Sequence, residues 1–217
     1  MSHESNAALL RDITRRLKAQ FWLKAVGVPS FMALFFWGYI YILKHAYFPV
    51  TVMPLTAIDR FIPYQPSAWL FYVSLWVYVQ LPLCLIDNRR QLVLYGWAAA
   101  AVSLIGFAFF VLSPTAVPPI GDEVAGTLLA GIRRIDTTGN SCPSLHVAFA
   151  VFTAVWIDQF IRKVGASVLF RFINLCWCLG IVYSTLSTKQ HVMLDVLAGV
   201  PLGLVGALAL ARLENRR

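Results

Sequence analysis

The sequence predicts an all-α polytopic membrane protein with six transmembrane helices and an amphipathic interfacial helix at its amino terminus. The chain of 217 residues is 59% hydrophobic and only 13% charged, whereas about a quarter of the residues of a soluble domain are charged. Six apolar runs are each close to the ~20 residues that a helix needs to cross ~30 Å of hydrocarbon. They lie at about 22–43, 67–86, 92–113, 145–161, 166–184 and 192–212.

Residues 1–20 are expected to form the interfacial helix, because apolar and basic side chains recur there at helical spacing on opposite faces. The apolar face holds Leu9, Leu10, Ile13 and Leu17, and the basic face holds Arg11, Arg15, Arg16 and Lys18. Such a helix lies along an anionic membrane surface; the alternative is a frayed, solvated tail. No small-residue cleavage site follows the first apolar run, so we expect this segment to be retained.

The six spans are expected to form a single membrane domain over residues 21–217, since no repeat or second domain is visible. Aromatic residues along the spans are interpreted as belt and packing residues. These are Tyr39, Tyr41, Trp69, Tyr72, Trp97 and Trp177. In the first loop, we expect Asp59 and Arg60 to form a local ion pair.

The positions of the basic residues predict the orientation in the membrane. Thirteen of the eighteen Lys and Arg lie at the two chain ends, in the second and fourth loops, or just inside the adjoining spans. Short cytoplasmic loops retain such residues, so we expect cytoplasmic termini and odd-numbered loops outside. The predicted site then faces outward, which in a bacterial inner membrane would be the periplasm. Topology therefore accounts for the net charge of +8 without a nucleic-acid partner.

Two polar stretches stand out because each begins a long apolar run on the predicted outer side. The first reads Asn-Ser-Cys-Pro-Ser-Leu-His at residues 140–146, and the second runs from Ser184 through His191 to Asp195. Ionisable residues at membrane depth indicate a functional site by default. Charge and motif position therefore agree on one outward-facing site.

His191 and Asp195 are four residues apart at the start of the sixth span, so they share one helical face. A carboxylate there can fix the imidazole tautomer and leave the other ring nitrogen to attack or to accept a proton. The alternative is a buried pair that only satisfies its own hydrogen bonds. Cys142 is the only cysteine in a polar motif, and we interpret it as a spacer because no base adjoins it more closely than His146.

The first polar stretch is typical of a helix start that binds an anion. Pro143 suits the first helical turn, with Cys142 as the cap. Free N–H groups and the helix dipole at such a start favour phosphate. Ser144 can add a hydroxyl donor and His146 can supply a proton.

The second stretch repeats this design at the sixth span. Ser187 or Thr188 is expected to cap the helix, with Gln190 completing a capping box. Lys189 adds a cation without an obvious structural purpose. Together the stretches predict a phosphoryl-transfer site, in which one histidine attacks phosphorus and the other protonates the leaving oxygen.

The order Pro-Ser-x-His at 143–146, then Ser184, His191 and Asp195, resembles the type 2 phosphatidic acid phosphatase superfamily, a six-helix membrane fold. The resemblance covers the chain from about Leu92 to its end. It implies that His191 is a nucleophile forming a phosphohistidine and that Asp195 orients it.

By the same resemblance, His146 would be the general acid, and Ser144 and Ser184 would help to hold the phosphate. Two departures concern phosphate charge: the usual arginine after the serine is Thr185, and a Lys-x6-Arg-Pro segment is absent because the chain contains no Arg-Pro dipeptide.

Replacement cations and hydroxyls are expected from Lys189, Thr188 and one of Arg133 and Arg134. For the two arginines the alternative is a solvated loop pair balanced by Asp136. Thr-Lys-Gln-His at 188–191 and Pro-Ser-Leu-His look more like the inositol phosphorylceramide synthase branch, whose members transfer a phospho-headgroup between lipids.

The leading interpretation is a lipid phosphatase or phosphotransferase that acts at the outer leaflet on a phospholipid or polyprenyl (pyro)phosphate, without a metal or cofactor. Three alternatives stay open: a headgroup transferase between lipids, a metal-dependent hydrolase with a His, His, Asp triad, and a non-catalytic lipid-binding protein. The lipid, the acceptor and the oligomeric state are not specified by the motifs.

Overall fold

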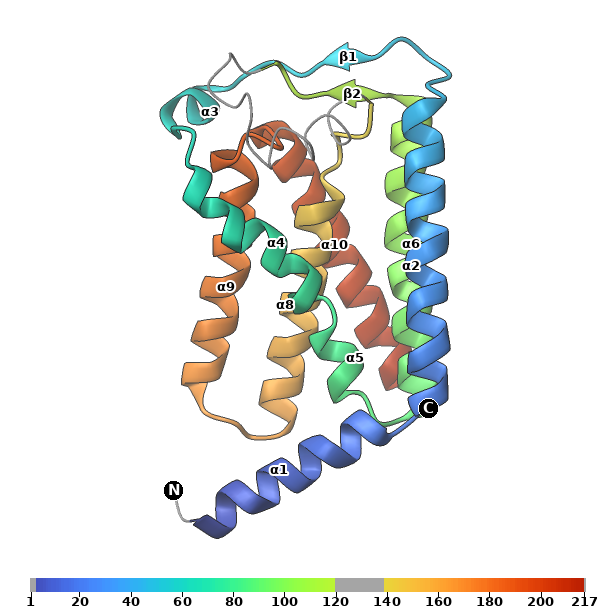
Figure 1. The fold of residues 1–217 in the computed structure, drawn as a ribbon, viewed down its shortest axis with the longest axis vertical. Coiled ribbons are helices and arrows are strands. Elements are labelled where there is room, and N and C mark those ends of the chain that lie inside the picture. The colour runs from blue at the N-terminus through green and yellow to red at the C-terminus, as the bar shows by residue number, and fades with distance from the viewer. Residues whose placement is uncertain (1–2, 120–138, 217) are drawn as a thin grey trace.

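Helices account for nearly all regular structure in the computed structural model, which describes residues 3–119 and 139–216 (Figure 1). The elements are α1 (His3–Lys18), α2 (Phe21–Lys44), β1 (Thr51–Val52), α3 (Ala57–Phe61), η1 (Pro66–Ala68), α4 (Trp69–Tyr78), α5 (Leu81–Leu85), α6 (Arg89–Leu112), β2 (Thr115–Ala116), α8 (Leu145–Lys163), α9 (Val168–Ser187) and α10 (Met193–Asn215). The all-α prediction is confirmed, because the two strands are only two residues long each.

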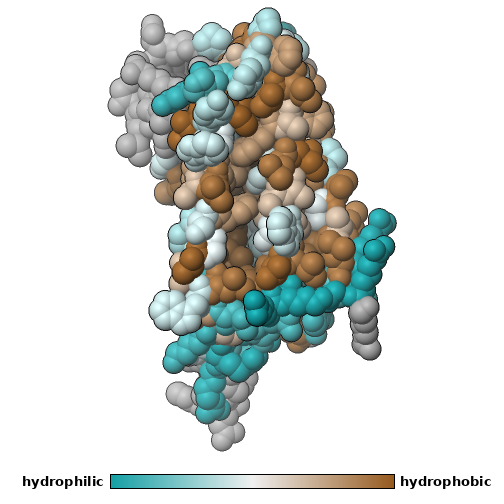
Figure 2. Space-filling model, turned by 90° about the vertical axis from the view of Figure 1, so that its right-hand side faces the viewer, coloured by the Kyte–Doolittle hydropathy of each residue, from teal (hydrophilic) through white to brown (hydrophobic). Residues whose placement is uncertain are grey.

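Six stretches of the described chain are long and apolar enough to cross a membrane, so the polytopic prediction is confirmed as well. They are Phe21–Lys44, Pro66–Leu85, Arg89–Leu112, Leu145–Lys163, Val168–Ser187 and Met193–Asn215. Each end lies within three residues of its predicted position. The surface seen in Figure 2 has a broad apolar zone above a hydrophilic band.

The second span is interrupted: α4 ends at Tyr78 and α5 begins at Leu81. Pro82 explains the break, since a proline ring clashes with the carbonyl four residues earlier, here that of Tyr78, and offers no N–H to it. The interruption places Gln80 between the two helical pieces. Its position matters for the cavity described below.

Helix α8 is the centre of the bundle and contacts α4, α5, α6, α9 and α10. Val147, Ala148, Ala150 and Phe152 on α8 are completely buried. By contrast, α2 contains no buried residue in the described structure, and it runs along α6 at the edge of the bundle (Figure 1).

Helices α8 and α10 approach each other closely because α10 has glycine where they cross. A Cβ atom on Gly199 would lie 2.5 Å from the Ser144 carbonyl oxygen, and one on Gly203 would lie even closer to that of Ala148. Small residues four apart allow such backbone contact between membrane helices. The first polar stretch is therefore held directly against the helix that carries Asp195.

A polar link joins three helices inside the apolar region. The Tyr78 hydroxyl donates to Asn174 Oδ1 at 2.6 Å, and Asn174 Nδ2 donates to the Ala154 carbonyl at 2.9 Å. Each buried polar atom thereby gains a partner, as apolar surroundings require. This link fixes α4 and α9 against α8.

The amino-terminal helix is confirmed as α1, and it is attached to the loop before α6. Arg15 and Arg16 place guanidinium nitrogens 2.9 and 3.4 Å from Asp87. The Arg16 guanidinium also donates to the Leu85 carbonyl. Both chain ends lie at this end of the bundle, whereas β1, β2 and α3 lie at the other (Figure 1).

Candidate active site

A short parallel strand pair brings the first and third loops together at the end of the bundle that lies away from α1. Thr51 of β1 pairs with Thr115 of β2, and Thr115 forms a further bridge to Asn140. Thr115 then holds the segment before α8, because its carbonyl accepts from Ser141 N–H and its hydroxyl accepts from Cys142 N–H at 2.9 Å. Thr115 thus holds the first polar stretch by two hydrogen bonds.

Ser144 is the cap of α8, and the predicted cap at Cys142 is wrong. Its hydroxyl oxygen accepts from Val147 N–H at 3.2 Å. A hydroxyl is a much better acceptor than a thiol, so the helix begins two residues later than expected and Pro143 precedes it. The Ser144 N–H donates to the Asp195 carbonyl at 3.1 Å. One bond therefore joins the two polar stretches.

His191 and Asp195 form the predicted pair. His191 Nδ1 lies 3.3 Å from Asp195 Oδ2, with 6% of the histidine side chain and none of the carboxylate exposed. Because a carboxylate oxygen accepts, Nδ1 carries the proton and Nε2 is left with its lone pair free of a proton. Oδ2 also accepts from Val192 N–H at 3.1 Å.

Helix α10 begins at Met193, so the predicted caps at Ser187 and Thr188, and the capping box with Gln190, are wrong. These residues belong instead to the end of α9. Gln190 N–H donates to the Thr185 carbonyl and Lys189 N–H to that of Leu186, with Lys189 at φ 57°. This is the Schellman arrangement that ends a helix in a left-handed residue.

Carboxylates supply the missing cap of α10. Besides the bond from Val192 to Asp195, Asp59 Oδ1 accepts from Met193 N–H at 2.7 Å. Asp59 Oδ2 accepts from both the N–H and the hydroxyl of Thr56 at 2.8 Å. The expected ion pair with Arg60 is not formed among the described residues, because these donors already surround the buried carboxylate and Arg60 is exposed.

Three predicted phosphate ligands direct their donors to carbonyl oxygens. Lys189 Nζ donates to Asp59 O at 2.8 Å and also to Ile62 O. The hydroxyls of Ser184 and Thr188 each donate at 2.6 Å to carbonyls of α9. Arg133 and Arg134 lie outside the described residues.

Helix α4 orients His146. Its Nε2 lies 3.0 Å from the Tyr72 carbonyl, and its ring stacks on the Tyr72 ring with centroids 4.1 Å apart and planes 12° apart. A carbonyl only accepts, so Nε2 carries a proton and Nδ1 is the nitrogen available for proton transfer. Sequence reasoning missed this role, because an aromatic residue inside an apolar run is indistinguishable from a packing residue.

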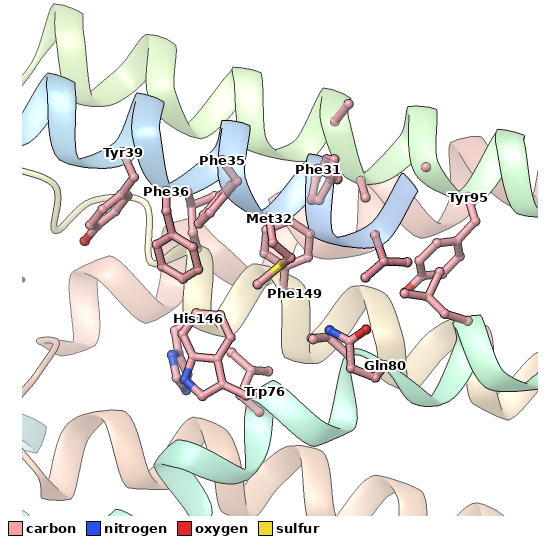
Figure 3. Close-up of a pocket in the computed structure, with 18 of the residues that line it drawn as sticks. Phe31, Met32, Phe35, Phe36, Tyr39, Trp76, Gln80, Tyr95, His146 and Phe149 are labelled. Atoms are coloured by element: carbon pink, nitrogen blue, oxygen red, sulfur yellow. The ribbon is translucent and has the colours of Figure 1, made fainter. Parts of the chain in front are cut away.

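Both histidines line one cavity of about 850 Å³ between α2, α4, α6 and α8. Asn140 joins them there, and its amide donates to the Tyr39 carbonyl at 3.0 Å. Figure 3 shows aromatic side chains of α2 and α8 around this space, with His146 at one end. The arrangement places His146 and His191 next to a mainly apolar chamber.

Several buried polar atoms in the two stretches lack a hydrogen-bond partner among the described residues. They are Asn140 Oδ1, Ser141 Oγ, both amide atoms of Gln190, and Asp195 Oδ1. Buried polar groups are normally paired, and their concentration beside the histidines is typical of a site that binds a polar group.

Within residues 3–119 and 139–216, no three His, Cys, Asp or Glu side chains are grouped so that they could hold a metal ion. His146, His191 and Asp195 do not converge on a common point in that way. The structure instead gives His146 a backbone carbonyl as partner and pairs His191 with Asp195.

The family model for the PAP2 superfamily matches residues 28–217. The match covers most of the chain, so the protein belongs to the PAP2 superfamily, which confirms the resemblance and extends it toward the amino terminus. No curated protein and no solved structure matches the chain. Members of this superfamily are generally phosphatases and phosphotransferases, so membership supports a phosphatase-type activity on lipid phosphates.

Proposed function

Because the chain belongs to the PAP2 superfamily, we propose that this protein cleaves the phosphate of a membrane lipid through a phosphohistidine on His191. The observation that carries the proposal is that His191, paired with Asp195 at 3.3 Å, and His146 line the same apolar cavity. An imidazole whose Nδ1–H is held by a carboxylate directs its Nε2 lone pair outward. A lipid phosphate entering the cavity would meet that nitrogen.

In the first step, His191 Nε2 attacks phosphorus and the bond from phosphorus to the lipid oxygen breaks. His146 donates a proton to that leaving oxygen. Because its Nε2–H is bonded to the Tyr72 carbonyl, the transferred proton comes from Nδ1 of the imidazolium, which becomes neutral. Asp195 stabilises the positive charge that develops on His191.

In the second step, an acceptor hydroxyl attacks the phosphohistidine and gives its proton to His146, which restores both histidines. Water as the acceptor yields inorganic phosphate, and a lipid hydroxyl yields a new phospholipid. The apolar walls of the cavity favour the second candidate function, the headgroup transfer typical of the inositol phosphorylceramide synthase branch, because they restrict water at the site. The two reactions differ only in this acceptor.

The proposed phosphate ligands are Ser144, Ser184, Thr188, Lys189, Arg133 and Arg134. For Ser184, Thr188 and Lys189, binding requires that a bond to a carbonyl oxygen be exchanged for a bond to phosphate. First-turn N–H groups of α8 and the helix dipole would add to them. With Thr185 in place of the family arginine, these groups share the neutralisation of the phosphate charge.

The site is proposed to face the periplasm of a bacterial inner membrane, with cytoplasmic chain ends. The bias of thirteen of eighteen basic residues supports this orientation. The placement of both polar stretches at the end of the bundle opposite α1 is consistent with it (Figure 1).

Replacement of the nucleophile tests the activity. His191→Ala should lower phosphate release from lipid phosphates by about a thousandfold or more, and it should remove the acid-labile phosphoenzyme formed with labelled substrate. His45→Ala is the matched control, because His45 is exposed and lies at the end of α2. A His191→Ala protein that works at the rate of the unaltered protein would falsify the proposal.

Product analysis then separates the acceptors. Labelled phosphate released as inorganic phosphate indicates hydrolysis, whereas label in a new phospholipid indicates transfer. Full activity after chelation, together with inhibition by vanadate, excludes the metal-dependent alternative. A protein that binds lipid phosphate but turns over none of it supports the non-catalytic alternative.

A further inference from the structure

The loop between α2 and α4 is apolar for a segment that lies outside the spans. From residue 45 to residue 66 it contains two charged residues, Asp59 and Arg60. Many of its large hydrophobic side chains are exposed instead of being packed against the bundle. They include Tyr47, Phe48, Val52, Leu55, Ile58 and Phe61. Exposed apolar surface gathered in one segment marks a site of interaction with a protein or a membrane.

Within this loop, the short helix α3 has a polar face and a hydrocarbon face. Phe61 is 87% exposed, and Ile58, three residues earlier on the same helical face, is 46% exposed. Asp59 lies between them in the chain, yet it is only 5% exposed and accepts from Met193 N–H of α10 at 2.7 Å. The polar contact of α3 is therefore directed to α10, while its hydrocarbon face is left uncovered in the described structure.

The hydrogen bonds of this loop place α3 at the level where the spans end. Lys189, two residues beyond the end of α9, donates from Nζ to the Asp59 carbonyl at 2.8 Å. Gln65 N–H donates to the carbonyl of Ser187, the last residue of α9. Helix α9 has 20 residues, which at ~1.5 Å each span roughly 30 Å, the thickness of the hydrocarbon core. Helix α3, drawn beside this end of α9 in Figure 1, therefore lies at the lipid–water boundary.

The lipid surface is the partner that fits this position. Figure 2 shows apolar side chains up to this end of the bundle, whereas the end that carries α1 is hydrophilic. The loop between α8 and α9 at that other end has Arg162 and Lys163 exposed. Apolar side chains at the edge of the hydrocarbon core are stabilised by lipid, as those of interfacial helices are. The hydrocarbon face of α3 thus continues the surface that the spans present to the membrane.

We propose that α3 anchors the first loop in the lipid–water boundary, with Ile58 and Phe61 inserted roughly 5–10 Å into the headgroup and acyl region, and that this anchor positions His191. The second part rests on the proposed function. Helix α3 bonds to Lys189 on one side of His191 and to Met193 on the other. A displacement of α3 therefore moves the backbone on both sides of the histidine.

The depth of position 61 tests the anchor without a measurement of activity. Phe61→Cys takes a nitroxide label in a variant whose four native cysteines are replaced by alanine, in vesicles of phosphatidylcholine and phosphatidylglycerol. Collisions with oxygen, which concentrates in the acyl region, should exceed collisions with a water-soluble nickel chelate. Lys163→Cys, exposed at the end of α8, is the matched control and should show the reverse preference.

Three results at position 61 overturn the anchor. A preference for the nickel chelate places the side chain in water. Protection from both reagents places it under another part of the protein. Dipolar broadening of the nitroxide spectrum that disappears on dilution with unlabelled protein places it against a second copy of the chain.

Turnover tests the link to His191. In the same vesicles, Phe61→Ser should lower kcat for dioleoyl phosphatidate or a polyprenyl phosphate by about threefold or more, with KM within about twofold, because the nucleophile is less well positioned. Phe61→Trp keeps an aromatic ring suited to the interface and should retain the kcat of the unaltered protein. Phe170→Ser is the matched control and should change neither constant, since it removes an exposed ring from the first turn of α9 at the opposite end of the bundle.

An unchanged kcat in Phe61→Ser overturns the link between α3 and His191. An equal loss of kcat in Phe61→Trp also overturns it, because both side chains would then fail for a reason other than contact with lipid. If the unaltered protein turns over neither lipid phosphate, the proposed function fails together with the link. The nitroxide measurements decide the anchor independently of that outcome.

Discussion

The α8–α10 seam and the α2–α4 side of the bundle are built from opposite kinds of contact. At the seam, glycines on α10 bring a backbone against the carbonyls of Ser144 and Ala148. On the other side, α2 is held by aromatic rings, such as Phe35 against Phe107 and Phe149, around the cavity described above. Tight packing holds the first polar stretch against the helix that carries Asp195, whereas loose packing leaves a cavity.

The same difference decides where the protein tolerates added volume. Backbone contact cannot yield without moving a whole helix, because close-packed interiors transmit a displacement to their neighbours. Aromatic side chains around the cavity can instead rotate or shift to make room for added volume. Two glycines therefore differ in what a side chain would meet. A Cβ atom on Gly203 would collide with the Ala148 carbonyl, whereas one on Gly96 would have nothing within 4 Å.

The largest effect is expected from Gly203→Leu. A side chain at this position meets the Ala148 carbonyl and the Val151 Cβ, so it must separate α8 from α10. Overpacking of this kind costs about 1–3 kcal/mol and occasionally more, and we expect the upper end of that range. Unfolding of the purified protein in detergent, followed against temperature, measures the loss.

Gly96→Leu is the control for that experiment, since it adds the same side chain to open space. It should unfold at the temperature of the unaltered protein or higher, because replacing a helical glycine removes a cost of roughly 0.5–1 kcal/mol. If both leucine variants lower the unfolding temperature equally, the α8–α10 seam is not packed more tightly than the walls of the cavity.

Asp59 connects the two sides, and its removal should have the next largest effect. The residue lies in the short helix α3 between α2 and α4, yet its carboxylate caps α10 two residues after His191. Asp59→Ala leaves buried donors unpaired, at a cost of about 1–3 kcal/mol. The start of α10 should also become less ordered, so kcat should fall by about tenfold or more while KM changes little.

Arg60→Ala is the matched control for Asp59→Ala. The structure pairs Asp59 with Thr56 and Met193 instead of Arg60, so loss of the arginine should leave kcat and the unfolding temperature near those of the unaltered protein. Equal effects of the two substitutions would indicate that Asp59 and Arg60 form the ion pair predicted from the sequence. Asp59→Asn, which keeps one acceptor oxygen, should lie between Asp59→Ala and the unaltered protein.

The fold was predictable because each span carries its own signal. Hydrophobic length alone located all six spans to within three residues, and helix spacing alone joined His191 to Asp195. Both inferences use residues close together in the chain. They need no knowledge of how the helices pack.

The errors concern contacts between distant segments. Helix α10 is capped by Asp59, 134 residues earlier, and a local motif at Ser187 cannot reveal that partner. His146 is oriented by Tyr72, 74 residues before it. The cavity is likewise a property of four helices together. Sequence therefore predicted that the two polar stretches meet, but not which residues position their histidines.

The smallest effect is expected at Cys142, which lies in the tightly packed half and has no role in the proposed reaction. Burial, with a smaller contribution from the negative charge of Asp195, raises the pKa of the Cys142 thiol to about 11. The thiolate is the reactive form, so at neutral pH this cysteine should react slowly with iodoacetamide. Its rate should rise about tenfold per pH unit as the pH increases toward that pKa.

A variant in which Cys84, Cys176 and Cys178 are replaced by alanine isolates this thiol for the measurement. Labelling after unfolding in detergent provides the reference, because the unfolded thiol titrates near its ordinary value of about 8.5. Cys142→Ala should keep phosphate release within about twofold, since Ser144 caps α8 without it. Fast labelling at neutral pH, or loss of turnover in Cys142→Ala, would instead make Cys142 part of the reacting group beside His146 and His191.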